Sequence, residues 1–138
     1  MTPNAPITVV AGIIPSDGKV LICQRRRNDV RPLKWEFPGG KVAPGESPRQ
    51  ALRRELKEEL GIDARIGEEL LAYEYLYPDG LHVHLTFYLI TGCHSDPQNR
   101  NFADMQWVTP DRLTEFDFLE GNRKLLQHLR FNAQEIPL

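Results

Sequence analysis

The stretch "GKVAPGESPRQALRRELKEELGI", residues 40–62, contains a helix whose two ends can be recognised from residue types. Ser47 is a favourable N-cap, and Gln50 can complete a capping box with it. Gly61 stands where helices commonly end in a residue at positive φ. The sequence therefore predicts a helix over residues 48–60. Its buried stripe, repeating every fourth residue, is expected to consist of Leu52, Leu56 and Leu60.

The same helix is expected to carry a cluster of carboxylates. Residues at i, i+3 and i+4 lie within an arc of about 100°, and Glu55, Glu58 and Glu59 have this spacing. Like charges so placed repel one another, which a divalent cation such as Mg²⁺ or Mn²⁺ would relieve, since both prefer oxygen ligands. The alternative is an ordinary solvated face, although such a face more naturally intersperses lysines.

A cation held by so few carboxylates usually completes its coordination with water and with substrate phosphates. The cluster therefore indicates phosphoryl chemistry, in which a cation neutralises developing charge and lowers the pKa of an attacking water. The Pro-Gly-Gly turn just before the quoted stretch can bring bare backbone close to this site. A carbonyl of this turn is a candidate ligand.

The composition is that of one ordinary globular domain, covering residues 1–138. A net charge of −2 provides no basic field for a nucleic-acid polymer or an anionic membrane. The two cysteines have no partner motif and indicate free thiols in a reducing compartment. No targeting or membrane-spanning segment is recognisable, so a cytoplasmic location is expected.

Residues outside the helix predict a mixed α/β domain with a largely hairpin-built sheet. We expect residues 7–14 to form a strand whose hairpin partner is 19–25, and a longer hairpin to join 66–77 with 81–91. A last strand is expected at 105–109, followed by a closing helix over 120–132.

The quoted stretch fills every position of the Nudix box, G-x5-E-x7-R-E-U-x-E-E-x-G-U, where U is aliphatic. With "WEFPGGK" before it and a long hairpin after it, the chain resembles the MutT-like group of the Nudix hydrolase family. The resemblance implies an α/β/α sandwich around a mixed β-sheet. It also implies Mg²⁺-dependent attack of water on a phosphorus of a substituted nucleoside diphosphate.

The resemblance further implies roles for individual box residues. Glu58 and Glu59 match the principal metal ligands of the family, and Glu55 matches a carboxylate that binds metal or activates water. Arg54 matches the arginine that orients a catalytic glutamate, and Glu46 has a secondary role in local charge pairing. The expected catalytic group is Glu55, Arg54 and Glu58.

Two further features of the metal site follow from the resemblance. Gly39 or Gly40 would supply the carbonyl ligand. Relatives of the MutT type often take another metal-binding acid from the loop before the last strand, where this chain has Asn101. Asp104 is the nearest carboxylate and is a candidate replacement, so the number of metal ions stays open.

Five residues are candidates for substrate binding by the same resemblance. Asn122 matches a purine-reading asparagine, Arg25 matches an arginine that assists it, and Phe37 matches a wall of the base site. Trp35 and Lys41 flank that wall. Each has an alternative role: Asn122 as a helix N-cap, Arg25 as the start of a basic surface cluster, and Trp35 and Phe37 as core.

The leading hypothesis is a nucleoside triphosphate pyrophosphohydrolase that clears 8-oxo-dGTP or a related nucleotide, releasing the monophosphate and pyrophosphate. Rival substrates are CTP, methylated pyrimidine nucleotides and nucleoside-diphosphate sugars. A different class, a non-catalytic nucleotide-sensing module, is disfavoured because such modules typically lose box glutamates and this chain retains them. The expected partner is a small nucleotide, and the protein is expected to be a monomer or a homodimer.

Overall fold

The computed structural model describes residues 6–131, with side chains to residue 129, and contains two β-sheets. The larger sheet is mixed, with β1 (Ile7–Ile13) at its centre. This strand runs parallel to β7 (His82–Cys93) and antiparallel to β5 (Gly39–Lys41). The long hairpin is completed by β6 (Ala64–Leu76), which forms the far edge.

The smaller sheet is built around β3 (Lys19–Gln24), and all its pairs are antiparallel. Its other strands are β2 (Pro15–Ser16), β4 (Trp35–Glu36) and β8 (Asp104–Val108). The β4 strand leads directly into the turn that begins β5, so this short segment joins the two sheets. That junction is where the pocket described below forms.

The predicted helix is confirmed as α1 (Pro48–Leu60), with the expected end signals. Ser47 accepts a hydrogen bond from the Gln50 backbone, and the Gln50 side chain accepts one from the Ser47 backbone. Gly61 ends the helix at φ 68°. The leucine stripe is fully buried against the larger sheet.

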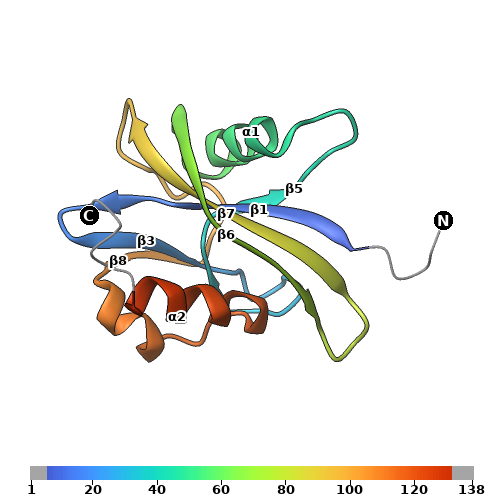
Figure 1. Ribbon diagram of the computed structural model, residues 1–138. Helices are drawn as coiled ribbons and strands as arrows, with labels where there is room; N and C mark the ends of the chain where they lie inside the picture. Colours follow the sequence, from blue (N-terminus) through green and yellow to red (C-terminus); the bar gives the residue numbers. More distant parts are fainter. Residues whose placement is uncertain (1–5, 132–138) are drawn as a thin grey trace.

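A second helical layer covers the opposite side of the sheets, so α1 and α2 (Arg123–Phe131) enclose them (Figure 1). Two short 3₁₀ helices, η1 (Pro110–Glu115) and η2 (Glu120–Asn122), lead into α2. This arrangement confirms the expected α/β/α sandwich around a mixed sheet. The closing helix therefore starts as a 3₁₀ turn, and Asn132, its expected last residue, lies outside the described residues.

The predicted hairpin between residues 7–14 and 19–25 is wrong. The turn at Asp17 and Gly18, both at positive φ, pairs β3 with the two residues of β2, and the Leu21 N–H donates to the carbonyl of Ile14, where the predicted strand ends, at 3.1 Å. β1 continues instead into the centre of the other sheet, where its second half is buried on both faces. An apolar run without alternation suits such a central, partly parallel position better than a hairpin arm.

Candidate active site

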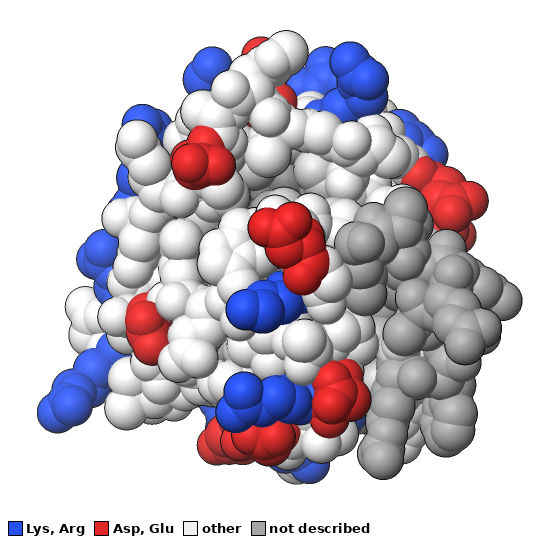
Figure 2. Space-filling view, turned by 90° about the vertical axis from the view of Figure 1, so that its left-hand side faces the viewer, with Lys and Arg blue, Asp and Glu red and all other residues white. Residues whose placement is uncertain are grey.

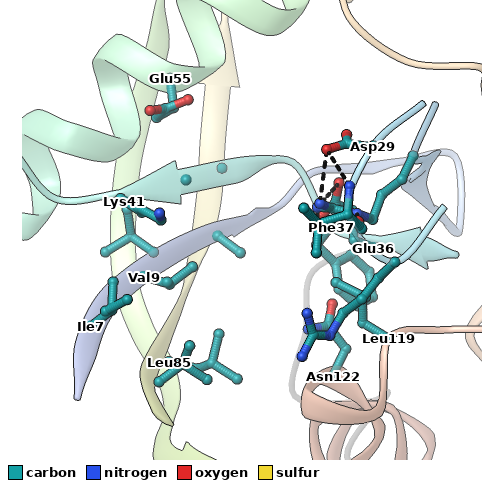
Figure 3. A pocket seen from close by; sticks show the side chains of 18 of the residues that line it. Ile7, Val9, Asp29, Glu36, Phe37, Lys41, Glu55, Leu85, Leu119 and Asn122 are labelled. Atoms are coloured by element: carbon teal, nitrogen blue, oxygen red, sulfur yellow. Dashed lines mark hydrogen bonds and ion pairs between the residues drawn. The ribbon is translucent and has the colours of Figure 1, made fainter. Parts of the chain in front are cut away.

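A pocket of about 690 Å³ opens beside the β4–β5 junction. It is lined by residues of both sheets, of α1 and of the η2 turn that precedes α2. Its two ends differ in chemistry. Glu55 projects from α1 at one end, whereas Phe37, Leu119 and Asn122 lie together at the other (Figure 3). Val9 and Leu85 form part of an apolar wall between them.

The acidic end combines side chains of α1 with the glycine backbone of β5. Glu55 and Glu59 line the pocket together with Gly39 and Gly40. The Gly39 N–H donates to Glu59 Oε1 at 3.0 Å. Burial, assisted by the neighbouring carboxylates of Glu36 and Glu55 and opposed by the Gly39 hydrogen bond, raises the pKa of Glu59 to about 9. A nearby cation would stabilise the charged form of this carboxyl group, which burial and the neighbouring carboxylates disfavour.

Arg54 orients two of the box glutamates at once. Its guanidinium donates to both oxygens of Glu46, at 2.7 and 2.9 Å, and to Glu55 Oε1 at 2.9 Å. The Arg54 hydrogen bond lowers the pKa of Glu46 to about 2, assisted by the Ala43 N–H. Burial raises the pKa of Glu55, while Arg54 lowers it. Glu46 is thus a fixed counter-ion that keeps Arg54 against Glu55.

Glu58 does not line the pocket. Its side chain is 60% exposed and is 3.4 Å from Arg54. The geometry brings Glu55 and Glu59 to the pocket, with Gly39 and Gly40, and leaves Glu58 outside the lining. Its role as a metal ligand stays a prediction.

The donors at the acidic end fit a hard divalent cation whose coordination shell is completed by the substrate. Two carboxylates and bare glycine backbone are oxygen-rich and contain no thiolate or imidazole. Within residues 6–131, no three Asp, Glu, His or Cys side chains are grouped closely enough to hold a metal ion alone. Magnesium in particular is often held by one or two carboxylates, with waters and phosphates supplying the other ligands.

The loop before β8 contributes an amide to this end, not an acid. Asn101 lines the pocket, and its Nδ2 is 3.5 Å from Glu59 Oε2. The loop is docked on the end of α1, because the N–H groups of Gln98 and Arg100 donate to the carbonyls of Leu60 and Glu59. Asp104, the candidate replacement, does not line the pocket and caps its own strand.

The other end of the pocket places the polar side chain of Asn122 beside apolar ones. Asn122 is only 6% exposed, and no hydrogen bond to its side-chain amide is found among the described residues. Phe37, 3% exposed, packs against Phe118 with ring centroids 5.4 Å apart. Since no side-chain nitrogen or oxygen of the described residues is both fully buried and unpaired, the Asn122 amide is accessible from the pocket, where it is suited to bind a polar ligand edge.

Of the three remaining residues predicted to bind substrate, two line the pocket and one does not. Lys41 and Arg25 line it. Arg25 is extensively bonded, donating to the Val30 carbonyl at 2.8 Å and to Glu36 at 3.2 Å. Trp35 does not line the pocket and packs edge-to-face on Phe116 at 5.1 Å. The alternative of Trp35 as a core residue is what the structure shows.

Several residues that line the pocket were not predicted as site residues, and Glu36 and Arg31 are among them. Glu36 lines the pocket, where burial raises its pKa to about 7 against the opposing effect of Arg25. Strand alternation was the available signal, because Trp35 and Phe37 face the core and the residue between them must face the other way. Arg31 also lines the pocket, and nothing local in the sequence distinguishes it from other loop arginines.

Gly40→Ala is expected to lower kcat/KM about 100-fold while the protein remains folded. A Cβ at this position would lie 2.5 Å from the Glu55 carboxyl carbon, so the side chain must move away from the pocket. Displacing a catalytic group by about 1 Å typically costs this much activity. Gly92→Ala, where a Cβ has no heavy atom within 4 Å, is the matched control. Equal activity of the two variants would contradict the expected role of Glu55.

The fold, the capped helix and the acidic pocket together define an enzyme of the Nudix hydrolase class. The chain belongs to the NUDIX domain family, whose match covers residues 4–129. It is a hydrolase that acts on nucleotides, and enzymes of this family generally use divalent metal ions.

Similar proteins support this assignment over most of the chain. The CTP pyrophosphohydrolase of Escherichia coli (strain K12) is 38% identical, covering 88% of this chain and 89% of that protein. The 8-oxo-dGTP diphosphatase of Haemophilus influenzae is 37% identical, covering 89% and 90%. The solution structure of the E. coli ORF135 protein superposes with a TM-score of 0.82 at 36% identity, covering 95% and 93%.

Proposed function

We propose that this protein is a Mg²⁺-dependent nucleoside triphosphate pyrophosphohydrolase, with Mn²⁺ as a possible substitute, that converts 8-oxo-dGTP or a related nucleotide to the monophosphate and pyrophosphate. One observation carries the proposal: a single pocket has half-buried carboxylates at one end and, at the other, an Asn122 amide that no protein group occupies and that the pocket leaves accessible. A nucleoside triphosphate has the matching polarity, with an anionic chain that needs a cation and a base edge that needs hydrogen bonds.

The acidic end would hold the phosphate chain. Glu55, Glu59 and the carbonyl of Gly39 or Gly40 would bind the metal, with Glu58 approaching from outside the pocket lining. When bound, the metal supplies charge neutralisation and a more acidic water. Arg54 keeps Glu55 in position, and Glu55 or Glu58 would accept a proton from the attacking water. Lys41, exposed beside the pocket, would attract the terminal phosphates.

The apolar end would bind the base. Asn122 offers both a donor and an acceptor to a purine edge, and Phe37 walls the site. Arg25 supports this end indirectly, because its bonds to Glu36 and Val30 hold that segment in place. Trp35, outside the pocket, would act only by packing behind it.

Hydrolysis of CTP or a methylated pyrimidine nucleotide is the second candidate. It is favoured by the similarity to a protein named as a CTP pyrophosphohydrolase and by Glu36, a half-buried carboxyl group in the pocket whose pKa is raised to about 7. A carboxyl group that is partly protonated at neutral pH can donate as well as accept a hydrogen bond, and so can pair with a pyrimidine edge.

Asn122→Ala is expected to lower kcat/KM for 8-oxo-dGTP by about 10- to 100-fold, with a much smaller loss for CTP, because one buried bidentate contact to the base is removed. The measurement is pyrophosphate release with Mg²⁺ from 8-oxo-dGTP, dGTP, CTP, 5-methyl-dCTP and a nucleoside-diphosphate sugar at low concentration. A preference for CTP in the parent protein, unaffected by Asn122→Ala, would select the second candidate. Absence of turnover with all of them would favour the nucleotide-sensing module.

We further propose that one domain acts alone or as a homodimer, in the cytoplasm, on small nucleotides and not on nucleic-acid polymers. Figure 2 shows acidic and basic side chains interspersed on the face it displays, with no continuous basic stretch there. No helix among residues 6–131 has the length and apolar character needed to cross a bilayer.

A further inference from the structure

Arg31 is held in the pocket by two contacts to the tip of the long hairpin. Its guanidinium donates to Asp79 Oδ2 at 2.7 Å and lies 3.9 Å from the centroid of the Tyr77 ring. Its side chain is only 17% exposed although it belongs to a surface loop, and both Arg31 and Tyr77 line the pocket. The loop of residues 26–34 is thereby joined to the turn between β6 and β7.

The backbone of this loop is unusual at the same position. Arg31 has φ 56°, and Leu33 has φ 62°. Residues other than glycine, asparagine and aspartate rarely adopt this region, because their Cβ approaches the backbone. Strained residues of this kind persist where the surroundings hold them, and they cluster at ligand sites. The conformation places the guanidinium between the loop and the hairpin.

Arg31 belongs to the Asn122 end of the pocket. The same Tyr77 ring on which it stacks carries a hydroxyl that accepts a hydrogen bond from the Gly121 N–H at 3.1 Å. The next residue along the chain is Asn122. One tyrosine ring therefore separates Arg31 from the turn that carries the unpaired amide, while the carboxylates of α1 lie at the other end.

We propose that Arg31 is a nucleotide-binding residue that offers the face of its guanidinium to the nucleobase. The inference deepens the proposed function and rests on it. One face of the group is covered by Tyr77 and its charge is compensated by Asp79, so its attraction for the distant phosphates is reduced. A planar cation with one covered face is well suited to stack its other face on the aromatic ring of a base. A lysine ammonium is not planar and cannot stack in this way.

The test compares three variants: Arg31→Asn, Arg31→Lys and the control Arg27→Asn. Asparagine tolerates positive φ, so Arg31→Asn removes the guanidinium without adding backbone strain. Arg27 is an exposed residue of the same loop that does not line the pocket, and its replacement changes the charge equally. Each is assayed with the preferred nucleoside triphosphate and with an abasic deoxyribose 5-triphosphate. Binding of the nucleoside monophosphate is measured by calorimetry in EDTA.

Both Arg31 variants are expected to raise the KM for the nucleoside triphosphate, and the Kd for the monophosphate, by about tenfold, with kcat within about twofold. Turnover of the abasic triphosphate should not change, and Arg27→Asn should behave as the parent. Equal losses with and without a base, unchanged KM and Kd, or full affinity in Arg31→Lys would each overturn the inference. If the parent hydrolyses no nucleotide, the proposed function fails, while the binding measurement still tests Arg31.

Discussion

Glu59→Gln is expected to reduce Mg²⁺-dependent kcat/KM by at least about 1,000-fold without unfolding the protein. Glutamine has nearly the same shape and can still accept the hydrogen bond from the Gly39 N–H, which glutamate accepts at 3.0 Å. It lacks the negative charge that holds a cation, and loss of a metal from a hydrolytic site removes both charge neutralisation and water activation. The measurement is pyrophosphate release over a range of Mg²⁺ concentrations.

Glu58→Gln is the informative comparison, since Glu58 is exposed and does not line the pocket, whereas Glu59 does. A loss of several orders of magnitude is expected here as well if Glu58 moves to the metal when substrate binds. Unchanged Mg²⁺-dependent turnover in both variants would refute the assignment of the metal site. A loss in Glu59→Gln alone would restrict the site to the groups that already line the pocket.

The same Glu59 variant is expected to stabilise the metal-free protein. Because folding raises the pKa of Glu59 from 4.5 to about 9, the folded state binds more protons than the unfolded state between these values. Stability therefore falls as pH rises through this window. In EDTA at pH 8.5, Glu59→Gln should unfold roughly 4–8 °C higher than the parent, corresponding to about 1–2 kcal/mol. The difference should shrink at pH 5, where the parent's carboxyl group is protonated. If the thermal unfolding midpoint of the parent protein in EDTA does not fall as the pH rises from 5 to 8.5, this prediction is contradicted.

Gly39→Ala is expected to lower the free energy of unfolding by at least about 3 kcal/mol, or the thermal midpoint by roughly 10 °C. A Cβ at Gly39 would collide with the carbonyl oxygen of Val10 and lie 2.7 Å from the Cα of Ala11. Both atoms belong to β1, with which Gly39 pairs in the sheet. Unlike the flexible carboxyl group opposite Gly40, this backbone is at the centre of the sheet and cannot yield locally.

Thermal and denaturant unfolding of Gly39→Ala and Gly92→Ala provide the comparison. Gly92 lies in β7 with no heavy atom within 4 Å of an added Cβ, so its replacement should change stability by no more than about 0.5 kcal/mol. Similar midpoints for the two variants would show that β5 is not packed on β1 as described. Such a result would also remove the glycine backbone from the acidic end of the pocket.

Much of the acidic end of the site could be predicted from the sequence because its determinants are local. The ends of α1 depend on side chains within a few residues of the caps, and the face shared by the glutamates follows from helical geometry. Glu55 and Glu59 accordingly line the pocket. Their roles in binding metal stay predictions.

The apolar end was predicted less completely, because contacts distant in sequence decide it. Asn122 and Phe37 do line the pocket, whereas Trp35, on the same strand face as Phe37, is turned into the core by Phe116. Glu36 enters the pocket through strand alternation combined with burial by neighbouring segments. Arg31 reaches it only because the hairpin tip, 46 and 48 residues further on, supplies Tyr77 and Asp79.

The sequence by itself determined the capped helix, the arrangement of its carboxylates and the long hairpin, since each depends on neighbours within one turn or one tight loop. Only the tertiary structure decided which strands flank β1, which glutamates enter the pocket, and which loop residues meet Asn122. The physical reason is that strand pairing and pocket lining are chosen by burial among segments far apart in the chain. Local residue types leave several such choices nearly equal, and the packed core selects one.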